Sequence, residues 1–268
     1  MPVHRGAACL GSVARDHLGA LAAWPDWFTV DAAGVHWHPG ADGIDADLDT
    51  VHRALHAQGL LRAWRDEPYP WLDEHGEQHA VIERAASRFW GALTFGAHCN
   101  GYVVGPDGRP AWLWIARRAL DKATDPGRLD NLIGGGVPLG QTPREALLRE
   151  AWEEAGLRPT ELDGLQDGSV LALHCAVREG LQREWLYVYD LPMPADLRPQ
   201  NQDGEVAEHR LMTVDQALAH AADGSMTVDA SLATLDFALR HALLPAAQAA
   251  ALAPRLRSEE HTSELQSR

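Results

Sequence analysis

Three glutamates follow one another along the segment Pro143–Ala155 with the spacing of one helix face. Glu150, Glu153 and Glu154 stand at i, i+3 and i+4, so an α-helix places their carboxylates on one arc about 100° wide. Like charges at this spacing repel one another and destabilise a helix that has no cation to neutralise them. Oxygen-only ligands favour a hard ion, so the expected cofactor is Mg²⁺ or Mn²⁺ and not zinc. An isolated Glu-x-x-Glu-Glu is more often a solvated helix face, and the neighbouring residues must decide between the two interpretations.

The surrounding sequence carries complete signals for the helix that positions these glutamates. Thr142 is a suitable N-cap, Pro143 suits the first helical position and Glu145 completes a capping box. Gly156 is placed to end the helix in the left-handed conformation. The preceding glycines, Gly134–Gly136, allow backbone carbonyls to approach an ion closely. The apolar residues of the helix form one broad arc, which we expect to be buried: Leu147, Leu148, Ala151, Trp152 and Ala155.

The segment from Gly134 to Leu157 resembles the Nudix box, whose pattern is Gly, five residues, Glu, seven residues and then Arg-Glu-apolar-x-Glu-Glu-x-Gly-apolar. Gly135 begins the match, and the later positions agree in register: Arg149, Glu150, Glu153, Glu154, Gly156 and Leu157. Two positions depart from the pattern. Gln141 stands where the pattern has Glu, which removes an accessory carboxylate, and Ala151 is smaller than the usual apolar residue.

The resemblance implies a role for each charged residue of the box. Glu150, Glu153 and Glu154 would bind the metal, with the carbonyl of Gly134 as a further ligand. Arg149 would orient the acidic cluster through an ion pair. The metal would hold a diphosphate bridge and activate the water that attacks one phosphorus, so the implied enzyme is a Nudix diphosphate hydrolase.

A general base and cationic phosphate contacts complete this expected site. Glu150 itself or a carboxylate from a later loop would be the base, and the candidates from that loop are Glu205 and Glu208. An exposed acidic turn explains these two glutamates equally well. Arginine is suited to bidentate phosphate contacts, although solvated surface use is at least as good an interpretation for any one cation. The candidate substrate-binding residues are Arg117, Arg118, Lys122 and Arg128.

Segments outside the box are similar to the Nudix proteins related to the C-terminal part of fungal thiamine pyrophosphokinase. They include Lys122–Asn131, Glu179–Asp190 and Phe95–Tyr102, and the similarity covers roughly residues 10–245. It implies hydrolysis of thiamine diphosphate, or of its oxidised or oxy derivatives, to monophosphate and phosphate. A nucleoside diphosphate derivative such as ADP-ribose is the alternative substrate. Alternatives of another class are an isopentenyl-diphosphate isomerase, which shares this fold and uses an acidic residue with a Cys, and a non-catalytic Nudix binding module.

The pattern of elements favours an α/β fold: a Nudix α/β/α sandwich with a mixed sheet over residues 97–247, preceded by a small α+β domain over residues 1–96. In the second domain we expect a hairpin over 102–116, strands at 170–177 and 184–189, and helices at 143–155, 214–222 and 231–244. In the first domain we expect helices at 14–23, 48–64 and 82–89, and strands at 28–30 and 35–38.

The N-terminal domain is expected to determine substrate specificity, because ligand pockets favour domain interfaces. Trp64, Trp71 and Trp90 are aromatic candidates for contact with the organic group of the substrate, although each is more often a core residue.

The composition limits the partners and the compartment. Asp plus Glu total 38 against 23 Lys plus Arg, and the net charge of −15 disfavours nucleic acid. The expected partner is a small-molecule organic diphosphate, and a homodimer is left open. The cysteines Cys9, Cys99 and Cys175 form neither a disulfide framework nor a zinc pattern, which favours the cytoplasm. No apolar stretch reaches the length of a membrane span.

The C-terminal residues 248–268 are expected to be a tail. Within it, residues 257–267 resemble the translation of a common sequencing adapter, so we interpret them as an artefact that replaces the native C-terminus.

Overall fold

The computed structural model describes residues 1–40 and 44–256, and it contains two compact units. The first unit comprises Met1–Thr94 together with Pro138–Gly140 and Leu173–Trp185. The second comprises Phe95–Val137, Gln141–Ala172 and, of the described residues, 186–256. The expected boundaries at 96 and 247 stay a prediction. The adapter-like residues 257–267 lie outside the described residues.

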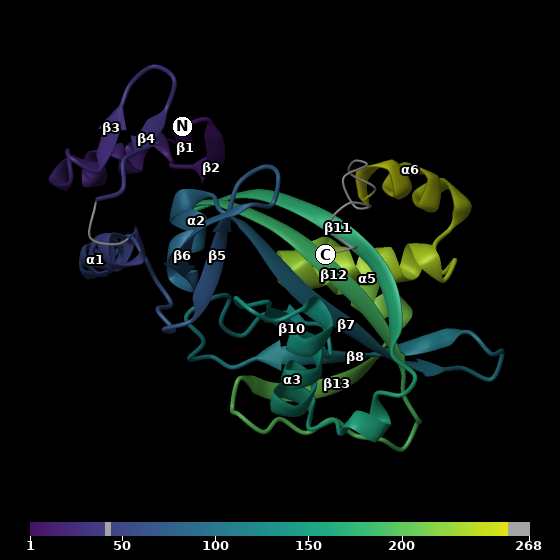
Figure 1. Ribbon diagram of the computed structural model, residues 1–268. Helices are drawn as coiled ribbons and strands as arrows, with labels where there is room; N and C mark the ends of the chain where they lie inside the picture. The colour runs from purple at the N-terminus through teal and green to yellow at the C-terminus, as the bar shows by residue number, and fades with distance from the viewer. Residues whose placement is uncertain (41–43, 257–268) are drawn as a thin grey trace. The chain divides into compact units, whose positions relative to one another are not determined.

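The first unit combines short strands and short helices. Its elements are β1 (Pro2–Arg5), β2 (Ala8–Ser12), η1 (Arg15–Ala23), β3 (Phe28–Val30), β4 (Val35–Trp37), α1 (Ile44–Ala57), β5 (Pro68–Leu72), β6 (Gln78–Glu83), η2 (Arg84–Ala86) and α2 (Ser87–Trp90). One sheet has the order β2-β1-β4-β3, with β1 parallel to β4, and β5 and β6 form a separate antiparallel hairpin (Figure 1). The expected helix over 82–89 is wrong in part, because its first two residues belong to β6, and only the 3-10 turn η2 and the short helix α2 follow.

Stacked tryptophans form the centre of the first unit's core. Trp37 and Trp71 lie 5.2 Å apart between ring centroids, and Trp71 and Trp90 lie 5.1 Å apart. The indole N–H of Trp71 donates to the carbonyl of Leu10 at 2.9 Å, so its polar atom is also satisfied inside the core. Trp71 and Trp90 have no exposed surface, which corrects their proposed role as substrate contacts. Trp64 is partly buried, under the guanidinium of Arg53.

His52 is a buried titratable group in this core. Its side chain is 1% exposed, and its Nε2 accepts a hydrogen bond of 2.9 Å from the indole N–H of Trp90. Burial lowers the pKa of His52 to about 4, so the imidazole is neutral in the folded protein. Between pH 6.5 and pH 4 the unfolded chain binds the additional proton. The folded state is therefore not penalised by His52 above about pH 6.5, and its free energy of unfolding decreases as the pH falls from 6.5 toward 4.

We expect this histidine to make the folded protein acid-sensitive. The free energy of unfolding should fall by on the order of 3 kcal/mol between pH 7 and pH 4 because of His52 alone. His52→Gln retains an acceptor for Trp90 but does not titrate, so its stability should depend less on pH over this range. Urea unfolding followed by tryptophan fluorescence gives the free energy of unfolding of wild type and of His52→Gln at each pH, and hence the slope of each against pH. His38→Gln, at an exposed histidine, is the control. Equal slopes in wild type and His52→Gln would contradict the prediction.

A seven-stranded sheet has the path β11-β12-β7-β8-β13, with β10 paired to β7 and β9 paired to β8 (Figure 1). Except for the strand ends that fall within Met1–Thr94 and Leu173–Trp185, this sheet belongs to the second unit. The remaining elements of the chain are β7 (Leu93–Val104), β8 (Pro110–Arg118), β9 (Leu129–Asp130), β10 (Ile133–Gly136), α3 (Pro143–Ala155), η3 (Pro159–Glu161), β11 (Gln166–Val177), β12 (Gly180–Pro192), β13 (Val206–Thr213), α4 (Val214–Asp223), α5 (Val228–Arg240) and α6 (Ala246–Leu256). The predicted hairpin over 102–116 is confirmed as β7 and β8.

Helices cover both faces of this sheet. Val103 and Trp114 pack with Leu147 and Ala151 of α3 on one face. Their chain neighbours Tyr102 and Leu113 pack with α4 and α5 on the other face, as the two-residue period of a strand requires. The predicted α/β sandwich is therefore confirmed, and so is a separate α+β N-terminal unit. Residues 246–256, where we expected the beginning of a tail, form the helix α6 that packs beside α5.

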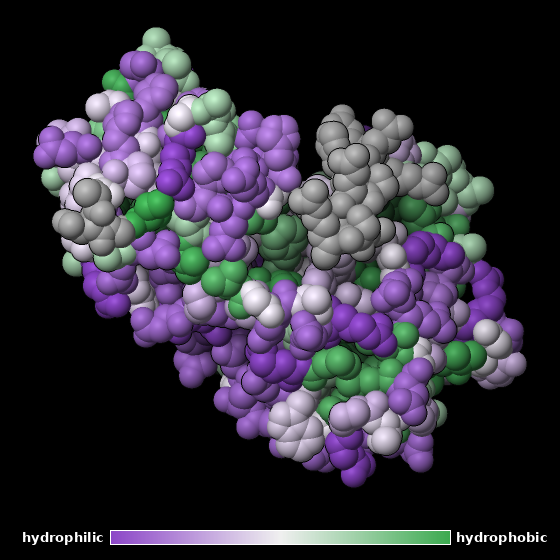
Figure 2. Space-filling model, viewed as in Figure 1, coloured by the Kyte–Doolittle hydropathy of each residue, from purple (hydrophilic) through white to green (hydrophobic). Residues whose placement is uncertain are grey.

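Figure 2 shows hydrophilic side chains over much of the face in view, with hydrophobic side chains gathered in smaller areas. Among the described helices, none has the length and apolar character that crossing a bilayer requires.

Candidate metal-binding site

The predicted helix is present with the predicted ends. α3 runs from Pro143 to Ala155, and its capping box is complete. The Glu145 N–H donates to Thr142 Oγ1 at 3.2 Å, and the Thr142 N–H donates to the Glu145 carboxylate at 2.8 Å. Gly156 ends the helix with φ of 65°, in the left-handed region that a residue without Cβ adopts readily.

The buried face of α3 differs from the predicted apolar arc. Leu148 is 40% exposed and Trp152 is 51% exposed, whereas Glu150 and Glu154 are only 9% and 5% exposed. The helix is therefore rotated so that two carboxylates face the protein and two large apolar side chains face solvent. Packing of Leu147 and Ala151 against the sheet fixes this rotation. A helical wheel of the apolar residues does not predict this rotation of the helix.

The glycine strand β10 explains how carboxylates can occupy a buried face. The Gly134 N–H donates to Glu154 Oε2 at 2.8 Å. A Cβ at Gly135 would lie 2.3 Å from Glu150 Oε1, closer than any tolerable contact. The carboxylate of Glu150 thus lies directly against a backbone that carries no side chain.

Strand β7 holds the glycine strand in place. Gly134 pairs with His98 across the antiparallel ladder, and a Cβ at Gly134 would lie 2.8 Å from the His98 ring. His98 Nδ1 is hydrogen-bonded to Asn131 Oδ1 at 2.9 Å, which fixes the ring. The adjacent Cys99 is fully buried and burial raises the pKa of its thiol, so it is a packed cysteine, as expected, and not a nucleophile.

The electrostatics of the carboxylates favour a bound cation. Burial raises the pKa of Glu154 well above its usual range, and the charges of Glu150 and Asp130 raise it further. The Gly134 N–H and the Lys122 ammonium act in the opposite direction and do not compensate. A hard cation between the carboxylates would remove this repulsion, so these residues fit a divalent metal.

Arg149 controls the outer part of the cluster. Its guanidinium lies 3.0 Å from Glu150 Oε1 and 2.8 Å from Glu153 Oε2. The Nudix resemblance implies an orienting ion pair for Arg149, and these two contacts are the ones that Arg149 makes with the glutamates. Gln141, the departure from the box, has a buried Oε1 without a hydrogen-bond partner among the residues that the structure describes. An unpaired buried acceptor is unusual in a folded protein and is open to a ligand.

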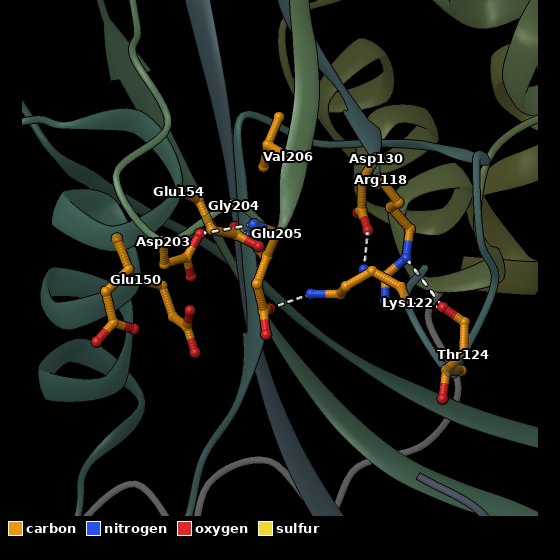
Figure 3. A network of polar contacts seen from close by, with 12 residues as sticks. Arg118, Lys122, Thr124, Asp130, Glu150, Glu154, Asp203, Gly204, Glu205 and Val206 are labelled. Atoms are coloured by element: carbon orange, nitrogen blue, oxygen red, sulfur yellow. Dashed lines mark hydrogen bonds and ion pairs between the residues drawn. The ribbon is translucent and has the colours of Figure 1, made fainter. Parts of the chain in front are cut away.

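A second set of charged residues lies beside the glutamates (Figure 3). Lys122 is ion-paired with Glu205, and Arg118 donates to Asp130 Oδ2 at 3.0 Å and to the Thr124 carbonyl. Asp130 also acts on Glu154, although sequence reasoning did not select it. No local signal identifies Asp130, because its position depends on the pairing of β9 with β8.

The structure separates the remaining candidates from this cluster. Arg117 and Glu208 are paired residues on β8 and β13, on the sheet face opposite to Trp114 and α3. Glu208 also pairs with Arg210. Arg128 donates to the Gly224 carbonyl at 2.8 Å. Of the predicted cations, Lys122 acts on the charge of Glu154 and Arg118 pairs with Asp130. Of the two loop glutamates, Glu205 pairs with Lys122.

A tighter group of ligand-type atoms occurs in the first unit. Among the described residues, one potential ligand atom from each of Asp73, Glu77 and His79 lies within 4.8 Å of the other two. Asp73 already accepts hydrogen bonds from the His75 and Glu77 N–H groups and contacts His79 Nε2. These contacts close the turn of the β5–β6 hairpin, so the group has a structural explanation.

Comparison with known proteins assigns a domain to each half of the chain. A NUDIX domain matches residues 96–229, and a domain of unknown function, DUF4743, matches residues 4–94. Nudix hydrolase 24, chloroplastic, of Arabidopsis thaliana is 37% identical over 196 residues, which are 72% of this chain and 53% of that protein. Nudix hydrolase 20, chloroplastic, of the same plant is 35% identical over 201 residues, covering 72% and 52%. The chain thus spans about half the length of these curated relatives.

A solved structure is also similar to part of this chain. The crystal structure of DR0079 from Deinococcus radiodurans matches with a TM-score of 0.47 and 27% identity, over 63% of this chain and 96% of that chain. The NUDIX match covers half of the sequence, and it contains the glutamates of the capped helix α3 and the glycine strand beneath them. The chain belongs to the Nudix family.

Proposed function

We propose that this protein is a metal-dependent hydrolase that cleaves the diphosphate bridge of a small organic diphosphate. The observation that supports this most is the burial of Glu150 and Glu154 against a glycine strand, with the pKa of Glu154 raised by neighbouring carboxylates. Such an arrangement costs stability in the absence of a cation, and it is the expected geometry of a hard-metal site.

Each residue has a proposed role. Glu150, Glu153 and Glu154 would hold Mg²⁺ or Mn²⁺ together with the Gly134 carbonyl, and Arg149 would orient the glutamates. The bound ion supplies Lewis-acid stabilisation of the phosphate charge and acidifies water. Lys122 and Arg118, which lie beside the carboxylates, would contact phosphate oxygens. Arg117 and Arg128 are not part of this contact set, because they bond other groups.

Glu205 is the proposed general base. It would take a proton from the attacking water while the water oxygen bonds to one phosphorus, and the bridging oxygen would leave with the electron pair of the broken bond. An isomerase that depends on a reactive cysteine is disfavoured, since Cys99 is fully buried with a raised pKa.

The proposed substrate class is thiamine diphosphate and its oxidised or oxy derivatives, which rests on the resemblance over residues 10–245. We expect the full chain with Mg²⁺ to hydrolyse oxythiamine diphosphate with a kcat/KM roughly tenfold or more above that for ADP-ribose, since specificity is a difference in transition-state binding. Product analysis by ³¹P NMR distinguishes monophosphate plus phosphate from the two monoesters that ADP-ribose yields. A preference for ADP-ribose would reject the thiamine-type substrate and leave the diphosphate hydrolase.

The specificity role of residues 1–96, a cytoplasmic location and a homodimer stay predictions.

A further inference from the structure

Lys122 is the only lysine in the sequence, whereas Lys and Arg together number 23. Its side chain is 8% exposed, and its ammonium is paired with the carboxylate of Glu205 (Figure 3). Arginine supplies every other side-chain cation apart from histidine. A guanidinium makes a fixed planar fork, while an ammonium is a compact charge whose donors rotate among several acceptors. The one lysine therefore provides, at Glu205, a cation whose donors can turn to another acceptor.

The segments that carry Lys122 and Glu205 are held together by contacts that do not involve this ion pair. The Ala119 N–H donates to the Glu205 carbonyl at 2.9 Å, and the Glu205 N–H donates to Asp203 Oδ1 at 2.8 Å. The Arg118 guanidinium donates to the Thr124 carbonyl. The ammonium can therefore change its partner without unfolding either loop.

The same ammonium also lies within the field of the metal-binding carboxylates. It lowers the pKa of Glu154, in opposition to burial and to the carboxylates of Glu150 and Asp130. A diphosphate held at the glutamates would bring phosphate oxygens into this field. Those oxygens would compete with Glu205 for the ammonium, because phosphate carries more charge than a carboxylate.

We propose that Lys122 exchanges partners during the reaction: without substrate its ammonium is paired with Glu205, and a bound diphosphate draws the ammonium away from Glu205 onto phosphate oxygens. This inference rests on the proposed function and adds to it a coupling between substrate binding and the general base. The pairing of Glu205 with Lys122 would be broken only when a substrate is present.

A double-mutant cycle tests this exchange with methylenediphosphonate, a diphosphate analogue that is not hydrolysed, and Mg²⁺. Lys122→Met should weaken analogue binding by about 10- to 100-fold, the equivalent of one charged hydrogen bond. Glu205→Gln should tighten binding by roughly 3- to 10-fold, because the competing carboxylate is gone. The double variant should bind like Lys122→Met alone, and Lys122→Arg should retain most of the affinity.

Matched controls separate this effect from a general change in charge. Glu208→Gln removes a carboxylate that pairs with Arg210, and Arg109→Met removes an exposed cation that donates to the Ala242 carbonyl. Both should leave analogue affinity unchanged. Melting temperatures of all variants show whether each one is folded.

Selective ¹⁵N-lysine labelling observes the exchange directly, because it gives a single side-chain ammonium resonance. That resonance should shift on addition of the analogue with Mg²⁺, and it should already differ in Glu205→Gln. An unchanged resonance, or weaker analogue binding by Glu205→Gln, would overturn the inference. If Glu154→Gln retains hydrolysis, the proposed function is wrong. If Glu154→Gln loses hydrolysis but the effects of Lys122→Met and Glu205→Gln on analogue binding simply add, only the partner exchange is wrong.

Discussion

Replacing Glu154 with Gln should reduce kcat by roughly a thousandfold or more, and Glu153→Gln should do the same separately. Each substitution keeps the shape of the side chain but removes one charged metal ligand, and loss of a metal-bound group costs several kcal/mol of transition-state stabilisation. Phosphate release measured with Mg²⁺ and a diphosphate substrate gives the ratio. A variant that retains more than about a tenth of the wild-type kcat would show that the residue does not hold the metal.

The same substitution should have the opposite effect on the metal-free protein. Glu154 is 5% exposed and its charge is opposed by Glu150 and Asp130, so a neutral amide at this position relieves repulsion. The melting temperature of metal-free Glu154→Gln should exceed that of the wild type by a few degrees. Added Mg²⁺ should stabilise the wild type more than the variant. Glu208→Gln is the control, because Glu208 is a paired carboxylate on the other face of the sheet. It should change neither the melting temperature of the metal-free protein nor the stabilisation by Mg²⁺.

A single methyl group at Gly135 should impair the site nearly as severely. In Gly135→Ala the new Cβ would lie 2.3 Å from Oε1, 2.5 Å from Cδ and 2.7 Å from Cγ of Glu150. All three atoms belong to the flexible end of a side chain, so the protein can respond by moving the carboxylate. The fold should therefore survive, while Glu150 leaves its position. Displacement of a positioned group by about 1 Å costs on the order of a hundredfold in rate, and we expect a loss of that size in kcat/KM.

Metal binding distinguishes this displacement from general damage. Mn²⁺ affinity, measured by titration calorimetry, should fall together with kcat/KM, while the melting temperature of the metal-free protein changes little. Gly19→Ala is the matched control, because its Cβ would meet nothing within 4 Å. If Gly135→Ala bound Mn²⁺ with wild-type affinity, the carboxylate of Glu150 would not be a ligand held by the glycine strand.

The ends of helix α3 could be predicted from the sequence because their determinants are local. A helix N-cap, a proline at the first position and a terminal glycine act within a few residues of chain, and α3 has the predicted first and last residues. The spacing of Glu150, Glu153 and Glu154 likewise follows from helix geometry alone. The hairpin of β7 and β8 was predictable for the same reason, since its turn residues lie between two apolar runs.

Elements with mixed composition were missed. Strand β13 carries Glu208 and Arg210 among its apolar residues, so its period was hidden, and α6 lay in a segment taken for a tail. Their identity as strand and helix depends on pairing with β8 and packing against α5.

The sequence by itself determined the candidate metal-binding glutamates, the helix that carries them and the family to which the chain belongs. Only the tertiary structure decided that Glu150 and Glu154 face inward while Leu148 and Trp152 face solvent, because the rotation of a helix is set by the surface on which it packs. It alone brought Asp130, Lys122 and Glu205 beside the glutamates and directed Arg117 and Glu208 to the other face. These placements depend on strand pairing between segments far apart in the chain, and no local residue pattern encodes such pairing.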